Sequence, residues 1–189
     1  MKLFLALLSA LLFFSCSLDY GAEVSVKDKV PEFVFTNTHF TRYENSKKSI
    51  EFTADAMEQY ASDRSSYAKN AKFLTMDSSG NTETSGSCNL ISLNTKKEIY
   101  TLYDKIILKN HTDNIEIIAE NLKWNAKTEQ LTSGADEYVE LRKDDIEIYG
   151  KGFSATGINL AFSFKSDVQG TIIQETEPEQ EDDSEDEDE

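Results

Sequence analysis

The chain carries a pattern of alternating apolar and polar side chains that recurs at a nearly fixed spacing. Residues 50–57, 115–122 and 146–153 align with one another, and residues 82–89 form a weaker copy. The copies start 32, 33 and 31 residues apart. In the three strong copies an apolar residue occupies the first and third places and glutamate the second, which is typical of a strand with one face in water. The pattern therefore predicts a repeating β unit.

Each copy follows another strand-like stretch across a polar turn, so the repeating unit is a β-hairpin. The preceding stretches are residues 40–43, 73–76, 106–109 and 138–142, and the turns are residues 44–48, 77–80, 110–113 and 143–144. The fifth place of each copy is small, as expected where a strand bends or a backbone comes close: Ala54, Gly86, Ala119 and Gly150. Only residues 54–61 leave room for a turn of helix. We predict an all-β domain of repeated antiparallel hairpins over residues 31–174.

Such hairpins form a long sheet whose apolar face must be covered, in a sandwich, in a closed barrel, or in a curled trough. Only the trough leaves apolar side chains reachable and suggests a carrier. Its groove is then predicted to be lined by Phe52, Leu102, Ile106, Leu108, Ile117, Leu122, Trp124, Phe153, Phe162 and Phe164. For each of these residues, ordinary core packing is the competing interpretation. A trough also has open edges that can accept a strand of another β-protein, here residues 34–40 and 162–173.

The N-terminal residues predict a secretory signal peptide. Lys2 precedes an apolar run over residues 3–14 that only Ser9 interrupts, and Ser15-Cys16 follows. The run is too short to span a bilayer, so residues 1–15 are expected to be removed. Residues 14–16 resemble the bacterial lipobox, which implies that Cys16 is acylated and that residues 16–30 form a tether to the membrane. The alternative is an ordinary signal peptide that contains a cysteine.

The C-terminal residues 175–189 contain eleven acidic side chains and no basic one. Such a segment repels itself and has little to bury, so we expect it to be disordered. It either binds divalent cations or a basic partner, or only keeps the protein soluble. The formal charge of the whole chain is −16, and without this tail and Lys2 about −6 remains. That balance argues against nucleic acid as a partner.

Side chains for catalysis or metal binding are sparse. His39 and His111 are the only histidines, and neither lies in a motif with a nucleophile or with spaced metal ligands. No phosphate-binding loop, Cys-x-x-Cys or His-Glu-x-x-His motif occurs. Cys88, the only cysteine besides Cys16, is expected to be a small buried residue or a free thiol. We therefore expect neither an enzyme nor a metal or cofactor site.

Four short segments, in a fixed order, resemble the repeat of the lipopolysaccharide-export periplasmic proteins, LptC and its relatives LptA and the OstA-like domains. They are residues 117–125, 131–133, 148–153 and 168–170, within a resemblance that covers about residues 33–173. The resemblance implies a β-jelly-roll trough beside an inner-membrane ABC transporter. Such a trough binds the acyl chains of lipopolysaccharide or a related glycolipid and passes them to an LptA-like β-protein docked edge to edge.

Two features depart from this family, namely the lipobox in place of a transmembrane helix and the acidic tail. The family implies the periplasmic side of the inner membrane, whereas Ser17 after the lipidated cysteine favours the outer membrane by the enterobacterial sorting rule. The sequence is therefore compatible with two functions. The first is a periplasmic lipid-transfer bridge, and the second is a structural or surface lipoprotein that binds proteins and carries no lipid.

Overall fold

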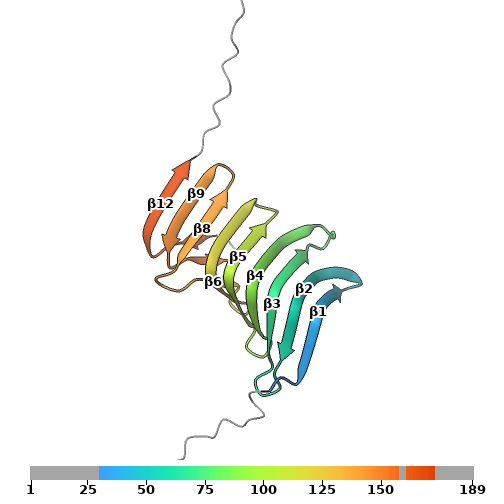
Figure 1. Ribbon diagram of the computed structural model, residues 1–189. Coiled ribbons are helices and arrows are strands. Elements are labelled where there is room, and N and C mark those ends of the chain that lie inside the picture. Colours follow the sequence, from blue (N-terminus) through green and yellow to red (C-terminus); the bar gives the residue numbers. More distant parts are fainter. Residues whose placement is uncertain (1–29, 158–160, 173–189) are drawn as a thin grey trace, which may run out of the picture. The chain divides into compact units, whose positions relative to one another are not determined.

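The computed structural model describes residues 30–157 and 161–172, which form a single antiparallel sheet (Figure 1). Its strands are β1 Phe33–Glu44, β2 Lys47–Gln59, β3 Ser65–Met76, β4 Thr82–Asn94, β5 Ile99–Asn110, β6 Ile115–Asn125, β7 Gln130–Thr132, β8 Tyr138–Lys143, β9 Ile146–Lys151, β10 Ser154–Thr156, β11 Phe162–Ser163 and β12 Ser166–Ile172. Among these described residues no helix is long and apolar enough to cross a membrane. The predicted signal peptide, Cys16 and the acidic tail lie outside the described residues.

The strands follow one another in sequence order from β1 to β6, and the sheet then divides. The first half of β6 pairs with β8, which leads to β9 and β12. The second half of β6 pairs with β7, which leads to β10 and β11. The central strands β5 and β6 are rich in Ile and also carry Tyr and Trp, residues that fit a pleated and half-buried surface.

All four predicted hairpins are confirmed as the pairs β1–β2, β3–β4, β5–β6 and β8–β9. The first turn shows why its residues suit the position. Asn45 and Ser46 have φ values of 49° and 63°, and a two-residue turn with both values positive matches the twist of the strands it joins. The alternative of a helical turn at residues 54–61 is wrong, because Lys47–Gln59 is one continuous strand.

The long strands bend near their middle, where Asn and Asp residues replace the regular ladder. Asn70 in β3 and Asp104 in β5 have φ values of 49° and 59°, a left-handed conformation that these residue types tolerate best. The Asn70 amide donates a hydrogen bond to Asp55 of β2 at 2.7 Å. The Asn89 amide of β4 donates one to Asp104 at 2.5 Å. These paired side chains occupy a line that divides the sheet into two halves.

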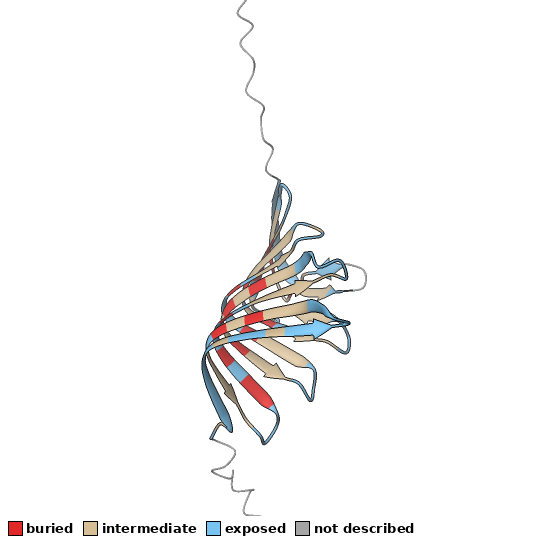
Figure 2. Ribbon diagram, turned by 90° about the vertical axis from the view of Figure 1, so that its right-hand side faces the viewer, coloured by how far each residue is buried: buried red, intermediate tan, exposed pale blue. Residues whose placement is uncertain are grey.

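We call these halves leaf 1 and leaf 2. Leaf 1 contains the start of β2, β4 and β6, the end of β3 and β5, and strands β8, β9 and β12. Leaf 2 contains the other half of each long strand together with β7, β10 and β11. The face that carries the buried side chains is the inner face of both leaves. In Figure 2 the strands are curved, and the buried residues concentrate in their middle portions.

The core lies along the bend. Ile106 of β5 and Leu122 of β6 are completely buried, and Ala119 and Val139 pack beside them. Cys88 belongs to the same cluster, and its burial raises the pKa of the thiol to about 11. Burial of these apolar side chains is the main force that keeps the sheet curved, because a flat sheet would expose them to water.

The small residues in the fifth place of each repeat have a packing role. At Gly86 an added Cβ atom would lie 2.5 Å from Cε1 of Phe73 and 2.7 Å from Cδ2 of Leu108. At Gly150 it would lie 2.6 Å from Cδ1 of Phe164. Both glycines therefore leave space for an aromatic ring on the inner face, which agrees with the close approach expected from the sequence.

Candidate functional site

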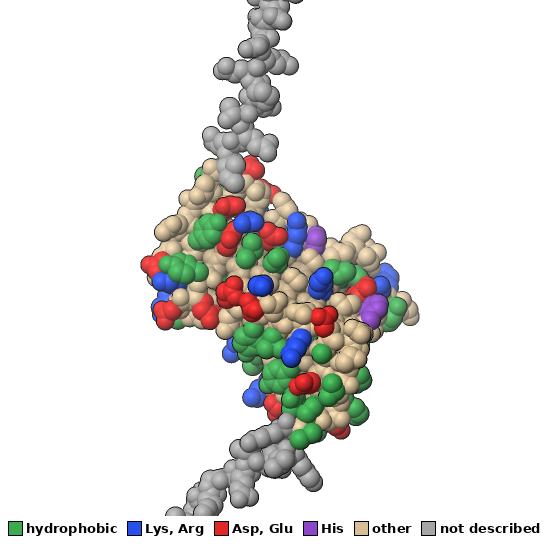
Figure 3. Space-filling view, in the orientation of Figure 1, with side chains coloured by type: hydrophobic (Ala, Val, Ile, Leu, Met, Phe, Trp, Pro, Cys, Tyr) green, Lys and Arg blue, Asp and Glu red, His purple; other side chains and the backbone are tan. Residues whose placement is uncertain are grey.

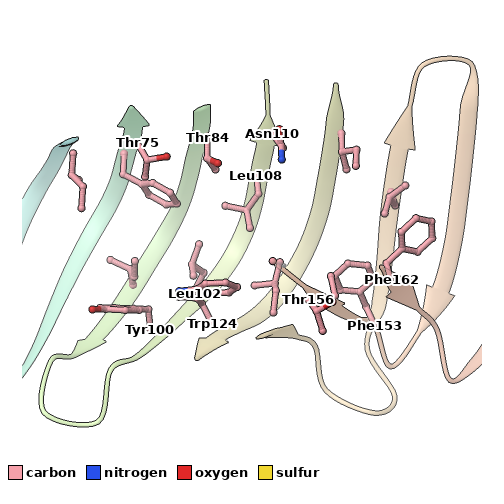
Figure 4. A pocket seen from close by; sticks show the side chains of 18 of the residues that line it. Thr75, Thr84, Tyr100, Leu102, Leu108, Asn110, Trp124, Phe153, Thr156 and Phe162 are labelled. Atoms are coloured by element: carbon pink, nitrogen blue, oxygen red, sulfur yellow. The ribbon is translucent and has the colours of Figure 1, made fainter. Parts of the chain in front are cut away.

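A cavity of about 530 Å³ opens between the two leaves. Residues of leaf 1 on one side and residues of leaf 2 on the other line it, and Figure 4 shows side chains from several strands directed into it. Its lining consists of Ile50, Phe52, Phe73, Thr75, Thr84, Ile91, Leu93, Tyr100, Leu102, Leu108, Asn110, Ile115, Trp124, Leu131, Leu141, Phe153, Ala155, Thr156, Gly157 and Phe162. The volume falls within the range of small-molecule pockets, about 300–1,000 Å³.

The chemistry of this lining is almost entirely apolar. None of these residues is Asp, Glu, Lys, Arg or His. The few polar groups are the hydroxyls of three threonines and Tyr100, the Asn110 amide and the Trp124 ring nitrogen. A site of this kind binds hydrocarbon through the hydrophobic effect and has no means to stabilise a buried charge.

Six of the ten residues predicted to line the groove border this cavity. They are Phe52, Leu102, Leu108, Trp124, Phe153 and Phe162. The other four do not. Ile106 and Leu122 lie at the bend and are sealed in the core. Ile117 packs against the core between its cross-strand partners Leu108 and Leu141, and Phe164 covers Gly150 and contacts the ring of Phe153.

Sequence reasoning missed several lining residues, most clearly Ile50, Phe73, Leu93, Tyr100 and Leu131. For Phe73 of β3 and Leu93 of β4 the reason is the bend. In β3, Ala68 is buried before Asn70, whereas Ala71 is buried after it, so the inward-facing positions change from even to odd numbers. A single alternation drawn through the whole strand therefore assigns half of it to the wrong face. An Asn or Asp inside an otherwise apolar strand was the available sign of this change.

Titratable side chains gather on the outer face of the sheet, away from the cavity. His39 lies 3.2 Å from Glu51, and hydrogen bonding to Lys48 lowers the pKa of that glutamate. The His111 ring is 2.9 Å from the Ser85 hydroxyl. Within the described ranges no three His, Cys, Asp or Glu side chains are placed to hold a metal ion.

A cluster around Arg142 also lies on the outer face. Its guanidinium donates a hydrogen bond to Glu140 and lies 3.3 Å from Glu147 and 3.7 Å from Glu116, and the bond to Glu140 is the main reason that the Arg142 pKa is raised. Glu116 and Glu147 belong to the neighbouring strands β6 and β9. Cross-strand ion pairs of this kind hold adjacent strands in register.

The two predicted open edges belong to strands that pair on one side only. β1 pairs with β2 alone, and β12 pairs with β9 alone. Phe33, Phe35 and Phe40 of β1 are each about half exposed, at 49%, 46% and 52%. Their cross-strand partners are Gln59, Met57 and Phe52, so the three phenyl rings extend the inner face up to this edge. Figure 3 shows hydrophobic side chains gathered at the β1 end of the sheet.

Comparisons with known proteins agree with this geometry. The model of the LptC family, described as lipopolysaccharide-assembly, LptC-related, matches residues 2–173. Among solved structures the chain resembles LptH from Pseudomonas aeruginosa, the LptA homologous periplasmic component of the conserved lipopolysaccharide transport device. The TM-score is 0.55 at 11% sequence identity, over 66% of this chain and 95% of that chain, which is a likeness of fold. The comparison with curated proteins found no match.

Proposed function

Because the chain belongs to the LptC-related family of lipopolysaccharide-assembly proteins, we propose that it is a periplasmic component of a lipopolysaccharide-transport bridge whose cavity receives the acyl chains of the lipid. The observation that carries this proposal is the apolar cavity between the leaves. A sealed sandwich would bury the same side chains without leaving a volume for cargo, so the cavity favours lipid carriage over a purely structural role.

Two adjacent residues of β5 provide the test. Leu108 lines the cavity, whereas Ile107 faces outward and is 45% exposed. We expect Leu108→Gln to reduce the lipid that remains bound after purification in mild detergent, because a buried amide without a partner opposes hydrocarbon in the cavity. The matched variant Ile107→Gln should retain lipid as the unchanged protein does. Equal lipid retention by both variants, with both folded by circular dichroism, would refute the proposal.

The free edges support a second part of the proposal, docking to neighbouring β-proteins of the LptA type. A strand edge with unpaired backbone groups can extend its sheet by one strand of a partner. At β1 such an addition would also continue the apolar inner face, because Phe33, Phe35 and Phe40 already reach the edge. We expect Phe35→Glu to weaken capture of an LptA-like protein. Thr36→Glu, at an exposed outer-face position of the same strand opposite Ala56, should have little effect, and equal loss in both variants would contradict docking through the inner-face rings.

The third part of the proposal is that a lipid on Cys16 anchors the protein to a membrane. It rests on the lipobox resemblance of residues 14–16, and such an anchor would hold the domain at a membrane surface. Metabolic labelling with a fatty-acid analogue should mark the protein, and Cys16→Ser should abolish both the label and membrane association. Persistence of the label in Cys16→Ser would exclude this cysteine as the anchor. Fractionation of the labelled protein would then distinguish the inner membrane, where an ABC transporter is the expected partner, from the outer membrane.

A further inference from the structure

Three of the six polar side chains of the cavity form a row along one margin. Thr75 of β3 pairs with Thr84 of β4, and Thr84 pairs with Asn110 of β5, so the three residues form one cross-strand row on the inner face of leaf 1. Figure 4 shows them in line near the ends of their strands, on the opposite side of the cavity from Tyr100 and Trp124. This margin therefore presents two hydroxyls and an amide side by side, whereas the polar groups of the opposite wall belong to two aromatic rings and to Thr156.

The Asn110 side chain is held in a fixed orientation. Its carbonyl oxygen accepts hydrogen bonds from the backbone N–H groups of Thr112 and Asp113, at 2.9 and 3.0 Å. Its amide nitrogen donates one to the Asp113 carboxylate at 3.0 Å. An amide nitrogen carries two hydrogens, so a second donor remains for a ligand. The hydroxyls of Thr75 and Thr84 can both donate and accept, which makes this margin suited to ester, amide or sugar oxygens.

A cation extends the same row beyond the cavity. Asn110 pairs with Ile115, which lines the cavity, and Ile115 pairs with Lys143 at the end of β8. Lys143 is exposed, so its ammonium group is available to a phosphate at the rim. In the other direction, Arg42 of β1 pairs with Ile50, although its guanidinium is already 2.8 Å from Glu44.

The opposite wall has a different character. Tyr100 pairs with Trp124, and Trp124 pairs with Leu131, which gives leaf 2 a continuous apolar and aromatic row. Thr156 at the end of β10 is the only aliphatic hydroxyl that this wall contributes to the described lining. The hydrogen-bonding atoms of Tyr100 and Trp124 lie at the edges of their rings. Polar atoms of a ligand placed against the ring faces or Leu131 would lose their hydrogen bonds to water without replacement, whereas hydrocarbon would lose nothing.

We propose that the cavity binds its glycolipid in one orientation, which rests on the lipid-carrying function proposed above. The acyl linkages and phosphorylated headgroup lie at the margin formed by Thr75, Thr84 and Asn110, and the methyl ends of the chains lie against Trp124. Thr75 and Thr84 are positioning residues in this arrangement, because their hydroxyls orient the glycolipid, whereas the apolar side chains of the cavity bind its hydrocarbon.

Trp124 makes the orientation measurable, because it is the only tryptophan of the chain. The probes are phosphatidic acids whose acyl chains carry bromine near the ester, in the middle, or near the methyl end. Bromine quenches indole fluorescence at contact, so quenching reports the part of the chain that touches Trp124. We expect the strongest quenching from bromine near the methyl end and the weakest from bromine near the ester. The reverse order, or equal quenching from all three probes, would overturn the orientation.

Binding is measured separately, by retention of the radiolabelled probe on the immobilised protein. If the probe is retained and the order of quenching is reversed or flat, the orientation fails while lipid carriage stands. If no probe is retained and none quenches, lipid carriage fails and the orientation fails with it. These results keep the two proposals distinguishable.

The double variant Thr75→Val and Thr84→Val removes both hydroxyls and preserves the branched shape of the side chains. We expect it to bind phosphatidic acid about tenfold more weakly, the equivalent of roughly one net hydrogen bond, and to lose the difference in quenching between the ester-end and methyl-end probes. Thr53→Val, on the outer face of leaf 1, is the matched control and should change neither quantity. Unchanged affinity and unchanged order of quenching in the double variant would overturn the role of the threonines.

Discussion

Replacing Gly86 with alanine tests how tightly the inner face of leaf 1 is packed. The new methyl group would lie 2.5 Å from Cε1 of Phe73 on β3 and 2.7 Å from Cδ2 of Leu108 on β5. Carbon atoms prefer separations of about 3.5–4.0 Å, so both neighbours must move. Overpacking of this kind costs about 1–3 kcal/mol. For a domain of this size we expect the free energy of unfolding to fall by about 2 kcal/mol and the Tm by about 4–8 °C.

The measurement is urea unfolding followed by Trp124 fluorescence and by circular dichroism, with Gly170→Ala as the control. At Gly170 an added Cβ would lie 3.6 Å from the Glu147 carbonyl oxygen and 4.0 Å from Cγ1 of Ile148, both ordinary contacts, so the change should stay within about 0.5 kcal/mol. Phe73→Ala in the Gly86→Ala background should relieve the clash, giving a coupling of about 0.5–3 kcal/mol in a double-mutant cycle. If Gly86→Ala were as stable as Gly170→Ala, or the two changes were strictly additive, the close packing described for this face would be wrong.

Four further outcomes are expected. Leu122→Ala, at a completely buried position, should lower the free energy of unfolding by about 2–5 kcal/mol, whereas Ile107→Ala on the outer face should cost less than about 1 kcal/mol in the same urea titration. Asn70→Ala should destabilise more than Asn70→Gly, because both lose the hydrogen bond to Asp55 but glycine accepts the φ of 49°; equal losses would show that the backbone conformation at the bend carries no strain. Cys88, with a pKa of about 11 and a buried thiol, should resist maleimide at pH 8 in folded Cys16→Ser protein and react in urea, and rapid labelling of the folded protein would contradict its burial. Hydrogen bonds, first from Asn81 and then from Ser79, lower the pKa of Asp77. The stabilisation by its carboxylate is therefore present above the unfolded pKa of about 3.9 and is lost as the pH falls through the folded value. Asp77→Asn should reduce this loss of stability in acid, measured by urea unfolding at low salt because the side chain is partly exposed.

The hairpins could be predicted from the sequence because their determinants are local. The turn residues Asn45 and Ser46 and the alternation on either side of them lie within a few positions of one another. The division of the sheet at β6 could not be predicted in this way. It depends on which half of β6 pairs with β7 and which with β8, and the alternation within a strand carries no information on that choice.

The cavity could be predicted only in part. Alternation identifies the face to which a side chain points, so Phe52, Leu102 and Leu108 were correctly placed on the inner face. It carries no information on depth, so Ile106 and Leu122 were assigned to the groove although the bend seals them in the core. Depth follows from where the strands bend, and the Asn and Asp residues that permit the bend resemble ordinary outward-facing polar positions when read in the sequence alone.

The sequential order of strands β1 to β5 also governs how a disturbance spreads through the molecule. Each of these strands shares backbone hydrogen bonds only with those that precede and follow it in the chain, so stability accumulates from neighbour to neighbour, as in solenoid repeats. Amide protons should accordingly exchange fastest at β1 and β12 and slowest near β5 and β6. Substitutions can then accumulate at either terminus of the sheet, and new contacts can evolve there, while its centre remains intact.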